Sequence, residues 1–368
     1  MAPIKSSLSR TVGRLLSVQK DTDLSLRGGV QSFRTSGPGP LGASGGNVAD
    51  ALEPGNGYVY HTFSTPGTFT CQNTNTIEIL VVGGGGATNQ FLGGGGGGGG
   101  VCHATDYQVA AGPHAITVGP GGTATHPGPD ASAGKGGDSY FGASGPARLT
   151  GYGGGRGAKY PAGTFPYEDT NPDNNSQTGG SGAGGVRNGP WPGNDAPSTF
   201  YSGKAATQVN PLNQDAPGTI TNYGNPGGDG GGAAPNSLVG GGGGGAGAAG
   251  GDYPSSTGGA GQPFPQFAYP LCFPSPYLPG LTPHSPNNTH YAGGGGGGRH
   301  LAGQGSNDGT ASPGGVGGGG TGGNGQPVAE TDGIDYLGGG GGDGGGYAPK
   351  GSDGGSGIVI IRYPTAVK

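Results

Sequence analysis

The chain has 368 residues, of which 98 are glycine and 33 are proline, and its formal net charge is −5. Only 29% of the residues are hydrophobic and 10% are charged, against about 25% charged in ordinary globular domains, which excludes a large apolar core. Three scattered cysteines (Cys71, Cys102 and Cys272) exclude a disulfide framework, and three buried thiols are favoured over one bridge with a single thiol left over.

The sequence predicts an N-terminal arm over residues 1–40, followed by a Gly/Pro linker over residues 41–57. Residues 1–34 hold six basic and two acidic side chains, and their apolar residues are too sparse to form a core. A basic arm can bind nucleic acid, but this one lacks interleaved aromatic residues, so we expect it to dock on another protein. Neither an apolar signal-peptide segment nor a stretch of 18 apolar residues occurs, so no membrane insertion is expected.

Short strands are predicted in the next segment, residues 58–122. They share alternating or continuous apolar and β-branched residues: 58–63, 68–71, 76–82, 107–109 and 114–118. The chain ends on another strongly apolar strand, residues 357–363. We expect this last strand to return and pair with the N-terminal strands, closing a small β-sandwich.

Long unbroken glycine runs include Gly93–Gly100, and others recur throughout residues 123–356. Such runs cannot build α-helices or a side-chain core, and by composition alone they are typical of a disordered linker. Left-handed threefold helices offer an ordered alternative, because neighbouring helices can satisfy each other's N–H and C=O groups when no side chain separates them. We therefore predict an all-β fold with a small β-sandwich, a bundle of polyglycine II helices and little or no α-helix.

Two segments interrupt the glycine region, residues 159–223 and 253–292. They are rich in proline and aromatic residues, and proline fixes φ and removes a backbone donor. We predict irregular, rigidified loops that join helices of the bundle.

Several motifs in order resemble the glycine-rich domain family that is common in bacteriophage tail and virion proteins. They are YHTFSTPGTFT, IEILVVGGGGA, HAITVGPGG, GGDSYFG, ARLTGYGGG and GGSGIVIIRYP, and they cover roughly residues 58–364. The arm, SSLSRTVGRLLSVQKDTDLSLRGGVQ, is similar to N-termini of tail-fibre-like proteins of marine cyanophages. The resemblance implies a small β-module with a polyglycine bundle, located on a virion as an exposed appendage or tail protein. The two Pro/aromatic segments depart from the family pattern.

No catalytic or cofactor motif occurs, so we predict a protein that is not an enzyme and has no cofactor. There is no His-Glu-x-x-His and no Gly-Lys-Ser/Thr. The seven histidines are dispersed, but His284 and His290 share one loop with His300 nearby; solvated loops are favoured over a metal site that a trimer axis gathers from these three. The spacing of Asp332, Asp335, Asp343 and Asp353 is not that of an EF-hand, although a calcium site between glycine turns stays open. Arg156 and Arg299 adjoin glycine runs, where they can donate to carbonyls at the edge of the bundle.

The predicted function is that of a tail fibre, whisker or fibre-tip component involved in host attachment. Aromatic side chains suit recognition of a host cell-surface glycan or outer-membrane protein. The candidates for receptor binding are Tyr160, Phe165, Tyr167, Trp191, Phe200, Tyr201, Phe264, Phe267, Tyr269, Phe273 and Tyr277. The candidates for attachment to other virion proteins are Arg10, Arg14, Leu15, Leu16, Leu24, Leu26 and Arg27.

Three alternatives stay open at this point. The aromatic residues can instead cap the ends of the bundle or fill a seam between subunits, for which a homotrimer is favoured. The whole protein can be a capsid or tail decoration protein with a purely stabilising role. More distantly, flat faces of threefold helices suit an ice-binding protein, although the charged arm and the proline-rich loops argue against regular ice-binding faces.

Overall fold

The chain divides into two units, Met1–Thr35 and Ser36–Lys368, and all residues that the structure describes belong to the second. This computed structural model describes residues 42–89, 93–124, 133–145, 147–158, 177–188, 199–200, 202–208, 216–231, 237–274, 289–301, 311–324, 329–345 and 351–365. The predicted all-β fold is confirmed: the described elements are antiparallel strands and extended segments, with one four-residue α-helix and one 3-10 helix.

A six-stranded sheet forms the centre of the sandwich. Its strands, in spatial order, are β1 (Ala49–Leu52), β2 (Tyr58–Phe63), β16 (Ile358–Pro364), β4 (Asn75–Val82), β5 (Val101–Val109) and β11 (Thr219–Tyr223). The C-terminal strand β16 lies between β2 and β4 and pairs with both in antiparallel register. The expectation that the last strand returns to the N-terminal sheet is therefore correct.

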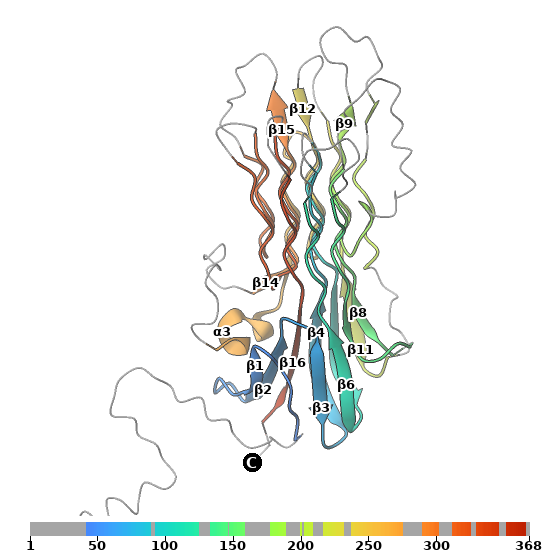
Figure 1. Cartoon of the computed structure of the whole chain (residues 1–368), viewed down its shortest axis with the longest axis vertical. Helices are drawn as coiled ribbons and strands as arrows, with labels where there is room; N and C mark the ends of the chain where they lie inside the picture. Colours follow the sequence, from blue (N-terminus) through green and yellow to red (C-terminus); the bar gives the residue numbers. More distant parts are fainter. Residues whose placement is uncertain are drawn as a thin grey trace, which may run out of the picture. The chain divides into compact units, whose positions relative to one another are not determined.

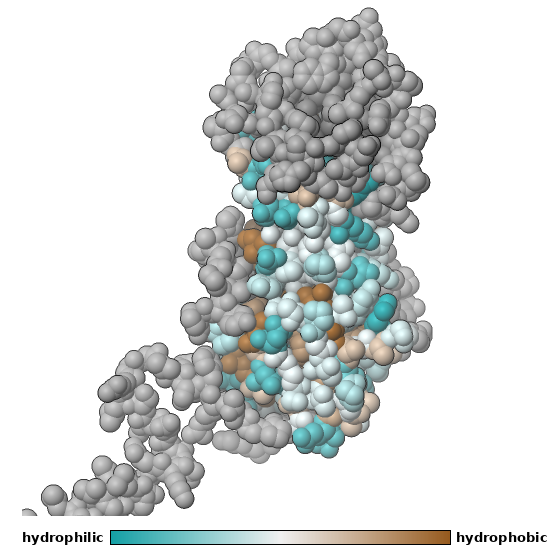
Figure 2. Space-filling view, viewed as in Figure 1, coloured by the Kyte–Doolittle hydropathy of each residue, from teal (hydrophilic) through white to brown (hydrophobic). Residues whose placement is uncertain are grey.

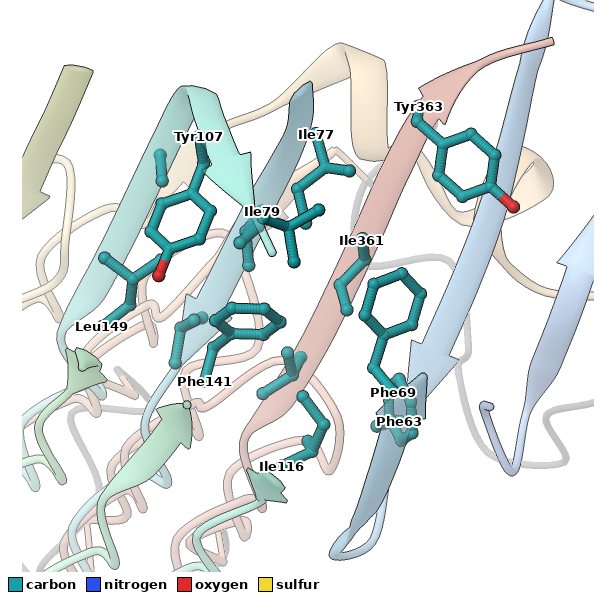
Figure 3. Packing of buried hydrophobic residues seen from close by; sticks show 14 of the residues in the cluster. Phe63, Phe69, Ile77, Ile79, Tyr107, Ile116, Phe141, Leu149, Ile361 and Tyr363 are labelled. Atoms are coloured by element: carbon teal, nitrogen blue, oxygen red, sulfur yellow. The ribbon is translucent and has the colours of Figure 1, made fainter. Parts of the chain in front are cut away.

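A four-stranded sheet packs against one face of this sheet. Its strands, in spatial order, are β3 (Gly67–Cys71), β6 (Gly112–Thr117), β7 (Ser139–Phe141) and β8 (Leu149–Gly151). Side chains from both sheets meet in one buried cluster, in which Phe63, Ile79 and Ile361 face Phe69 and Phe141 (Figure 3). The predicted β-sandwich is confirmed by this shared core.

The other face of the six-stranded sheet is covered as well. Tyr60, Leu80 and Ile360 point to this side and belong to a second buried cluster. The 3-10 helix η1 (Pro265–Phe267) and the helix α3 (Tyr269–Cys272) supply the covering aromatic side chains. Because both faces are buried, residues 79–82 of β4 and 358–361 of β16 are continuously apolar rather than alternating.

The glycine runs leave the sandwich as extended segments that lie side by side (Figure 1). Gly93–Gly100 shows the arrangement most clearly. Every third N–H of this run donates to the same neighbouring segment, at N···O distances of 2.7–3.3 Å: Gly94, Gly97 and Gly100 to residues 152–158, Gly95 and Gly98 to residues 241–244, and Gly96 and Gly99 to residues 338–341. This period of three residues is that of the predicted threefold helix.

The carbonyl groups of the same run follow the same period. They accept from three further segments: Gly97 and Gly100 from residues 83–86, Gly95 and Gly98 from residues 181–184, and Gly93 and Gly96 from residues 295–298. Six neighbours thus surround one helix, and its backbone is satisfied almost entirely by lateral hydrogen bonds.

The close approach of the backbones explains why the runs are glycine. A Cβ atom on Gly96 would overlap the carbonyl oxygen of Gly86, and one on Gly243 would overlap that of Gly96. No rotamer relieves such an overlap, because the obstructing atom is backbone. The neighbouring helices would have to move apart and lose hydrogen bonds.

Three short ladders complete the fold. The pair β9 (Arg187–Asn188) with β10 (Thr199–Phe200) and the pair β12 (Ser237–Val239) with β15 (Arg299–Leu301) lie at the end of the bundle remote from the sandwich (Figure 1). The pair β13 (Gln262–Pro263) with β14 (His290–Tyr291) lies near the sandwich. The two ends of the bundle therefore carry different elements, the sandwich at one and the ladders β9–β10 and β12–β15 at the other.

The structure corrects three predicted boundaries. The predicted linker 41–57 contains β1, which pairs with β2 and belongs to the sheet. The predicted loop 159–223 contains bundle segments at residues 179–185 and 203–208, and ends in strand β11. The predicted loop 253–292 begins with a bundle segment at residues 256–261 and then covers the sheet through η1 and α3. Stretches of small residues within the aromatic segments, such as GGSGAGG at residues 179–185, were the sequence signal for these bundle segments.

Candidate functional site

The aromatic segment 262–273 is the best described of the predicted recognition segments, and it is docked onto the six-stranded sheet. Phe264, Phe267 and Phe273 are 3%, 0% and 4% exposed and belong to the second core cluster. These three side chains are therefore packing residues, and the prediction that they bind a receptor is wrong because no surface of them is available. Tyr269 is half-buried and stacks on the Phe273 ring at a centroid distance of 4.9 Å.

Hydrogen bonds hold this segment to the sheet. Tyr60 Oη donates to the Gln266 carbonyl at 3.0 Å, and Thr62 Oγ1 donates to the Cys272 carbonyl at 2.8 Å. From strand β14, Tyr291 Oη donates to the Phe267 carbonyl at 2.7 Å. Burial raises the pKa of the Cys272 thiol to about 12, so this cysteine is an inert core residue.

An ion-pair network lies at the edge of the same contact. Glu78 Oε2 accepts from Arg362 Nε at 2.6 Å, and Glu78 Oε1 lies 2.8 Å from His103 Nε2 and accepts from Gln266 Nε2 at 3.3 Å. Burial alone would raise the pKa of Glu78, but the hydrogen bonds and charges of His103 and Arg362 outweigh burial and lower it. The Arg362 guanidinium also lies 4.1 Å from the Tyr58 ring centroid. The network joins β4, β5, β16 and η1 and has a structural role.

A second polar cluster fixes β1 to the sheet. Asp50 Oδ1 accepts from the Gly45 N–H at 2.9 Å and lies 3.3 Å from His61 Nδ1. The other ring nitrogen of His61, which is fully buried, lies 3.1 Å from Tyr363 Oη. The hydrogen bond from His61 is the main reason that the pKa of Asp50 is lowered. Burial raises the pKa of Tyr363 far above its ordinary range.

Aspartates at the perimeter of the bundle replace missing backbone partners. Each accepts a backbone N–H of a neighbouring segment on Oδ1 at 2.5–2.8 Å: Asp138 from Gly153, Asp229 from Gly203, Asp252 from Asp229, Asp332 from Asp353, Asp335 from Ser356, and Asp353 from Ala124. An outer helix lacks a neighbour on one side, and a side-chain oxygen can take the place of the missing carbonyl. This role was not predicted from the sequence, where Asp332, Asp335 and Asp353 were considered only as calcium ligands. In the described ranges, no group of three or more His, Cys, Asp or Glu side chains is placed to hold a metal ion.

Two further expectations concern arginine and cysteine. Arg299 Nη2 donates to the Pro254 carbonyl at 2.6 Å, which confirms its expected contact with a backbone carbonyl. Arg156 is buried within the bundle. The three cysteines are buried and form no disulfide, as expected.

The remaining predicted site residues lie outside the described part of the chain. These are Tyr160, Phe165, Tyr167, Trp191, Tyr201 and Tyr277, together with all seven residues proposed for attachment in the arm. Phe200 is described only as part of β10. The strands that flank Trp191 are described: Asn188 pairs with Thr199 beside the bundle end remote from the sandwich.

The surface of the described part is weakly polar. Figure 2 shows a largely pale and teal surface with scattered brown patches. Among the described residues, two large hydrophobic side chains are exposed, Tyr253 at 39% and Val316 at 44%. None of the helices that the structure describes has the length and apolar character needed to cross a membrane.

Comparison with known proteins agrees with this architecture. No curated protein matches the chain at the required significance. A family model described as a glycine-rich domain matches residues 61–364, which include the sandwich from β2 to β16 and the whole bundle between them. The chain therefore belongs to the glycine-rich domain family.

Proposed function

We propose that the protein is a non-enzymatic structural component of a bacteriophage virion, a tail fibre, whisker or fibre-tip protein that takes part in host attachment. In this proposal the protein joins other virion proteins through residues 1–40 and works as a homo-oligomer. The resemblance of its motifs and of its arm to phage proteins supports the virion assignment.

The observation that carries the proposal is that the two ends of the described unit carry different parts of the chain. Gly42, the first described residue, lies beside β3, where its carbonyl accepts from the Gln72 N–H at 3.3 Å. The chain therefore enters the unit at the sandwich. The ladders β9–β10 and β12–β15 lie at the other end of the bundle (Figure 1). A bundle held by backbone hydrogen bonds is a rigid spacer between an attachment end and a recognition end.

The recognition residues of the proposal are those that the described core does not use. They are Trp191, Tyr160, Phe165, Tyr167 and Tyr201, all outside the described residues. Aromatic side chains offer large, rigid contact areas and dominate interface energetics, which suits a host glycan or outer-membrane protein as partner.

A purely stabilising decoration protein is the second candidate. It is favoured by the burial of Phe264, Phe267 and Phe273, which shows that this chain uses some of its aromatic residues for internal packing. The two candidates differ in whether the remaining aromatic residues contact the host.

Substitution of Trp191 separates them. In the host-attachment proposal, Trp191→Ala lowers the affinity for host cells about thirtyfold, the effect of losing an interface residue worth about 2 kcal/mol, while particle assembly and melting temperature stay unchanged. The matched control is Val316→Ala, which removes an exposed apolar side chain whose backbone bonds to Gly261 next to β13, near the sandwich. Unchanged adsorption, or a loss of adsorption that tracks a loss of thermal stability, contradicts host recognition by Trp191 and favours the decoration protein.

Deletion of residues 1–40 tests the attachment part of the proposal. The truncated protein should fold, because β1 and every other described strand lie beyond residue 40, but it should not join the particle. Incorporation of the truncated protein into particles would place the attachment site elsewhere.

A further inference from the structure

One carboxyl group lies inside the bundle rather than at its perimeter. Asp343 is 0% exposed and follows directly on the run Gly338–Gly342. Its backbone takes part in the lateral ladder, since its N–H donates to the Gly296 carbonyl at 2.9 Å and its carbonyl accepts from Gly323 at 2.8 Å. Asp343 thus occupies a bundle position that is otherwise filled by glycine, and its side chain lies between the helices.

The Asp343 side chain takes over one position of that ladder. Gly99 donates to the Gly338 carbonyl, and Gly96, three residues earlier, donates to the Gly341 carbonyl, three residues later. One more step of three residues in each direction would make the carbonyl of residue 344 the partner of the Gly93 N–H. Instead, the Gly93 N–H donates to Asp343 Oδ2 at 2.6 Å. Asp343 therefore secures the first described residue of the central helix at the end remote from the sandwich.

The other oxygen of this carboxyl group has no hydrogen-bond partner among the described residues. Oδ1 is buried, and a methyl group on Gly93 would lie 2.7 Å from it. The same face of Gly93 meets the carbonyl oxygen of Ala158, and the Gly344 carbonyl lies on the Gly298 side of the carboxyl group. An ionised carboxylate would place negative charge among carbonyl oxygens, whereas a carboxylic acid carries a proton that such oxygens can accept.

Among the charges on neighbouring segments, that of Glu330 acts on Asp343 and opposes its ionisation. The charged side chains on the segments that pack around it are Arg156, Arg299, Glu330, Asp332 and Asp353. Arg299 directs Nη2 to the Pro254 carbonyl. Burial raises the pKa of Asp343 well above its ordinary value; the Gly93 N–H lowers it and the charge of Glu330 raises it further.

We propose that Asp343 stabilises the remote end of the bundle only while its side chain is protonated. As a neutral carboxylic acid it holds the neighbouring segments together, and when it ionises it destabilises that end. This device is independent of the proposed function. Its consequence is that the bundle end, which carries β12 and β15, loses stability as the pH rises above the range in which ordinary aspartates ionise.

The test compares the wild-type chain with Asp343→Asn, which keeps the shape and the acceptor for Gly93 but cannot ionise. The unfolded chain ionises Asp343 near pH 4, so above this pH folding to the neutral acid takes up one proton. The unfolding equilibrium constant of the wild type, divided by that of Asp343→Asn, should rise about tenfold for each pH unit until Asp343 ionises in the folded state. A ratio that stays constant between about pH 4 and pH 7 overturns the proposal.

The matched control is Asp332→Asn, which removes an exposed carboxylate that also accepts a backbone N–H in the bundle. The unfolding equilibrium constant of the wild type, divided by that of Asp332→Asn, should not rise between about pH 4 and pH 7. A measurement on the wild type alone guards against a variant that fails to fold: at about pH 6, infrared spectroscopy should detect the carbonyl band of one protonated carboxyl group, which ionised carboxylates lack. Absence of that band also overturns the proposal.

Discussion

The sandwich and the bundle of this protein are stabilised by different kinds of interaction. In the sandwich, side chains such as Phe69, Phe141 and Ile361 fill a buried cluster between two sheets. In the bundle, a helix such as Gly93–Gly100 has no side chains at all, and its N–H and C=O groups bond to six neighbouring segments. The sandwich therefore depends on the volume of its side chains, and the bundle depends on their absence.

This difference teaches that a well-ordered interior does not require a hydrophobic core. Each lateral hydrogen bond contributes only about 0.5–1.5 kcal/mol net, but the close spacing of glycine backbones allows many of them in a small volume. The two regions should consequently respond in opposite ways to the gain and the loss of side-chain atoms.

The largest effect is expected from removing a side chain in the sandwich. Phe141 is fully buried and contacts the rings of Phe69, Tyr107 and His114 at centroid distances of 5.5–6.4 Å. Phe141→Ala should lower the free energy of unfolding by about 3–5 kcal/mol because it leaves a cavity. Urea denaturation measures this, with the exposed Val316→Ala as a control that should stay within about 0.5 kcal/mol. Equal effects of the two variants would contradict a packed sandwich core.

Adding one methyl group to the bundle should also destabilise the protein. Gly→Ala normally stabilises a fold by about 0.4–1 kcal/mol through the unfolded chain. At Gly96 the sign should reverse, because the methyl group overlaps the Gly86 carbonyl and separates helices, at a cost of about 1–3 kcal/mol for each buried group left unsatisfied.

The matched control for that substitution is Gly134→Ala. A Cβ atom on Gly134 would meet its nearest neighbour, the Thr123 nitrogen, at 3.0 Å, so a small adjustment accommodates it. Thermal unfolding of both variants should show a clear loss only for Gly96→Ala. A loss of the same size at Gly134 would mean that alanine is disfavoured for its backbone preferences rather than for its volume.

A smaller effect is expected where the covering segment 262–273 meets the sheet. Glu78→Gln removes the charge that pairs with Arg362 and His103, and this should cost about 1–3 kcal/mol. A double-mutant cycle with Arg362→Met isolates the pair, and the two losses should not add. Strict additivity would show that the Glu78–Arg362 pair contributes no interaction energy to stability.

The smallest effect concerns Asp50 and pH. Since the folded-state pKa of Asp50 is lowered, its contribution is present above the ordinary aspartate pKa of about 4 and is lost as the pH falls through the folded value. Its side chain is 54% exposed, so the contribution should lie within about 0–1 kcal/mol. Unfolding curves of wild type and Asp50→Asn should differ at pH 6 and converge in strong acid. A difference that persists unchanged below about pH 3 would contradict this linkage.

Much of this architecture follows from the sequence, because its signals are local. The alternating strand Tyr58–Phe63, the apolar strands near residues 76–82 and 358–363, and the glycine runs each specify their own conformation. The covering helices η1 and α3 were not predicted, since a four-residue helix that begins with Tyr-Pro has no periodicity to detect. An indirect signal was present: Ile358–Ile361 is apolar on both faces of its strand, and such a strand needs a cover on each side.

The candidate site was predicted less well than the fold. Aromatic composition alone cannot distinguish a recognition residue from a packing residue, because both uses reward large rigid rings. Phe267 illustrates the difficulty: it lies in a proline-rich segment typical of an exposed loop, yet it is 0% exposed. Only the three-dimensional position of the segment, over Tyr60 and Ile360, decides the matter.

Hydrogen exchange of the glycine amides tests the central claim most directly. If lateral hydrogen bonds hold the bundle together, the amides of Gly95–Gly99 should be as protected as those of the central strands β4 and β16, although they have no side chain to shield them. Mass spectrometry of peptides from residues 93–100 and 76–82 compares the two regions in one experiment. Equal, slow exchange is the predicted result. Fast exchange of the glycine peptide beside a protected strand peptide would contradict the account.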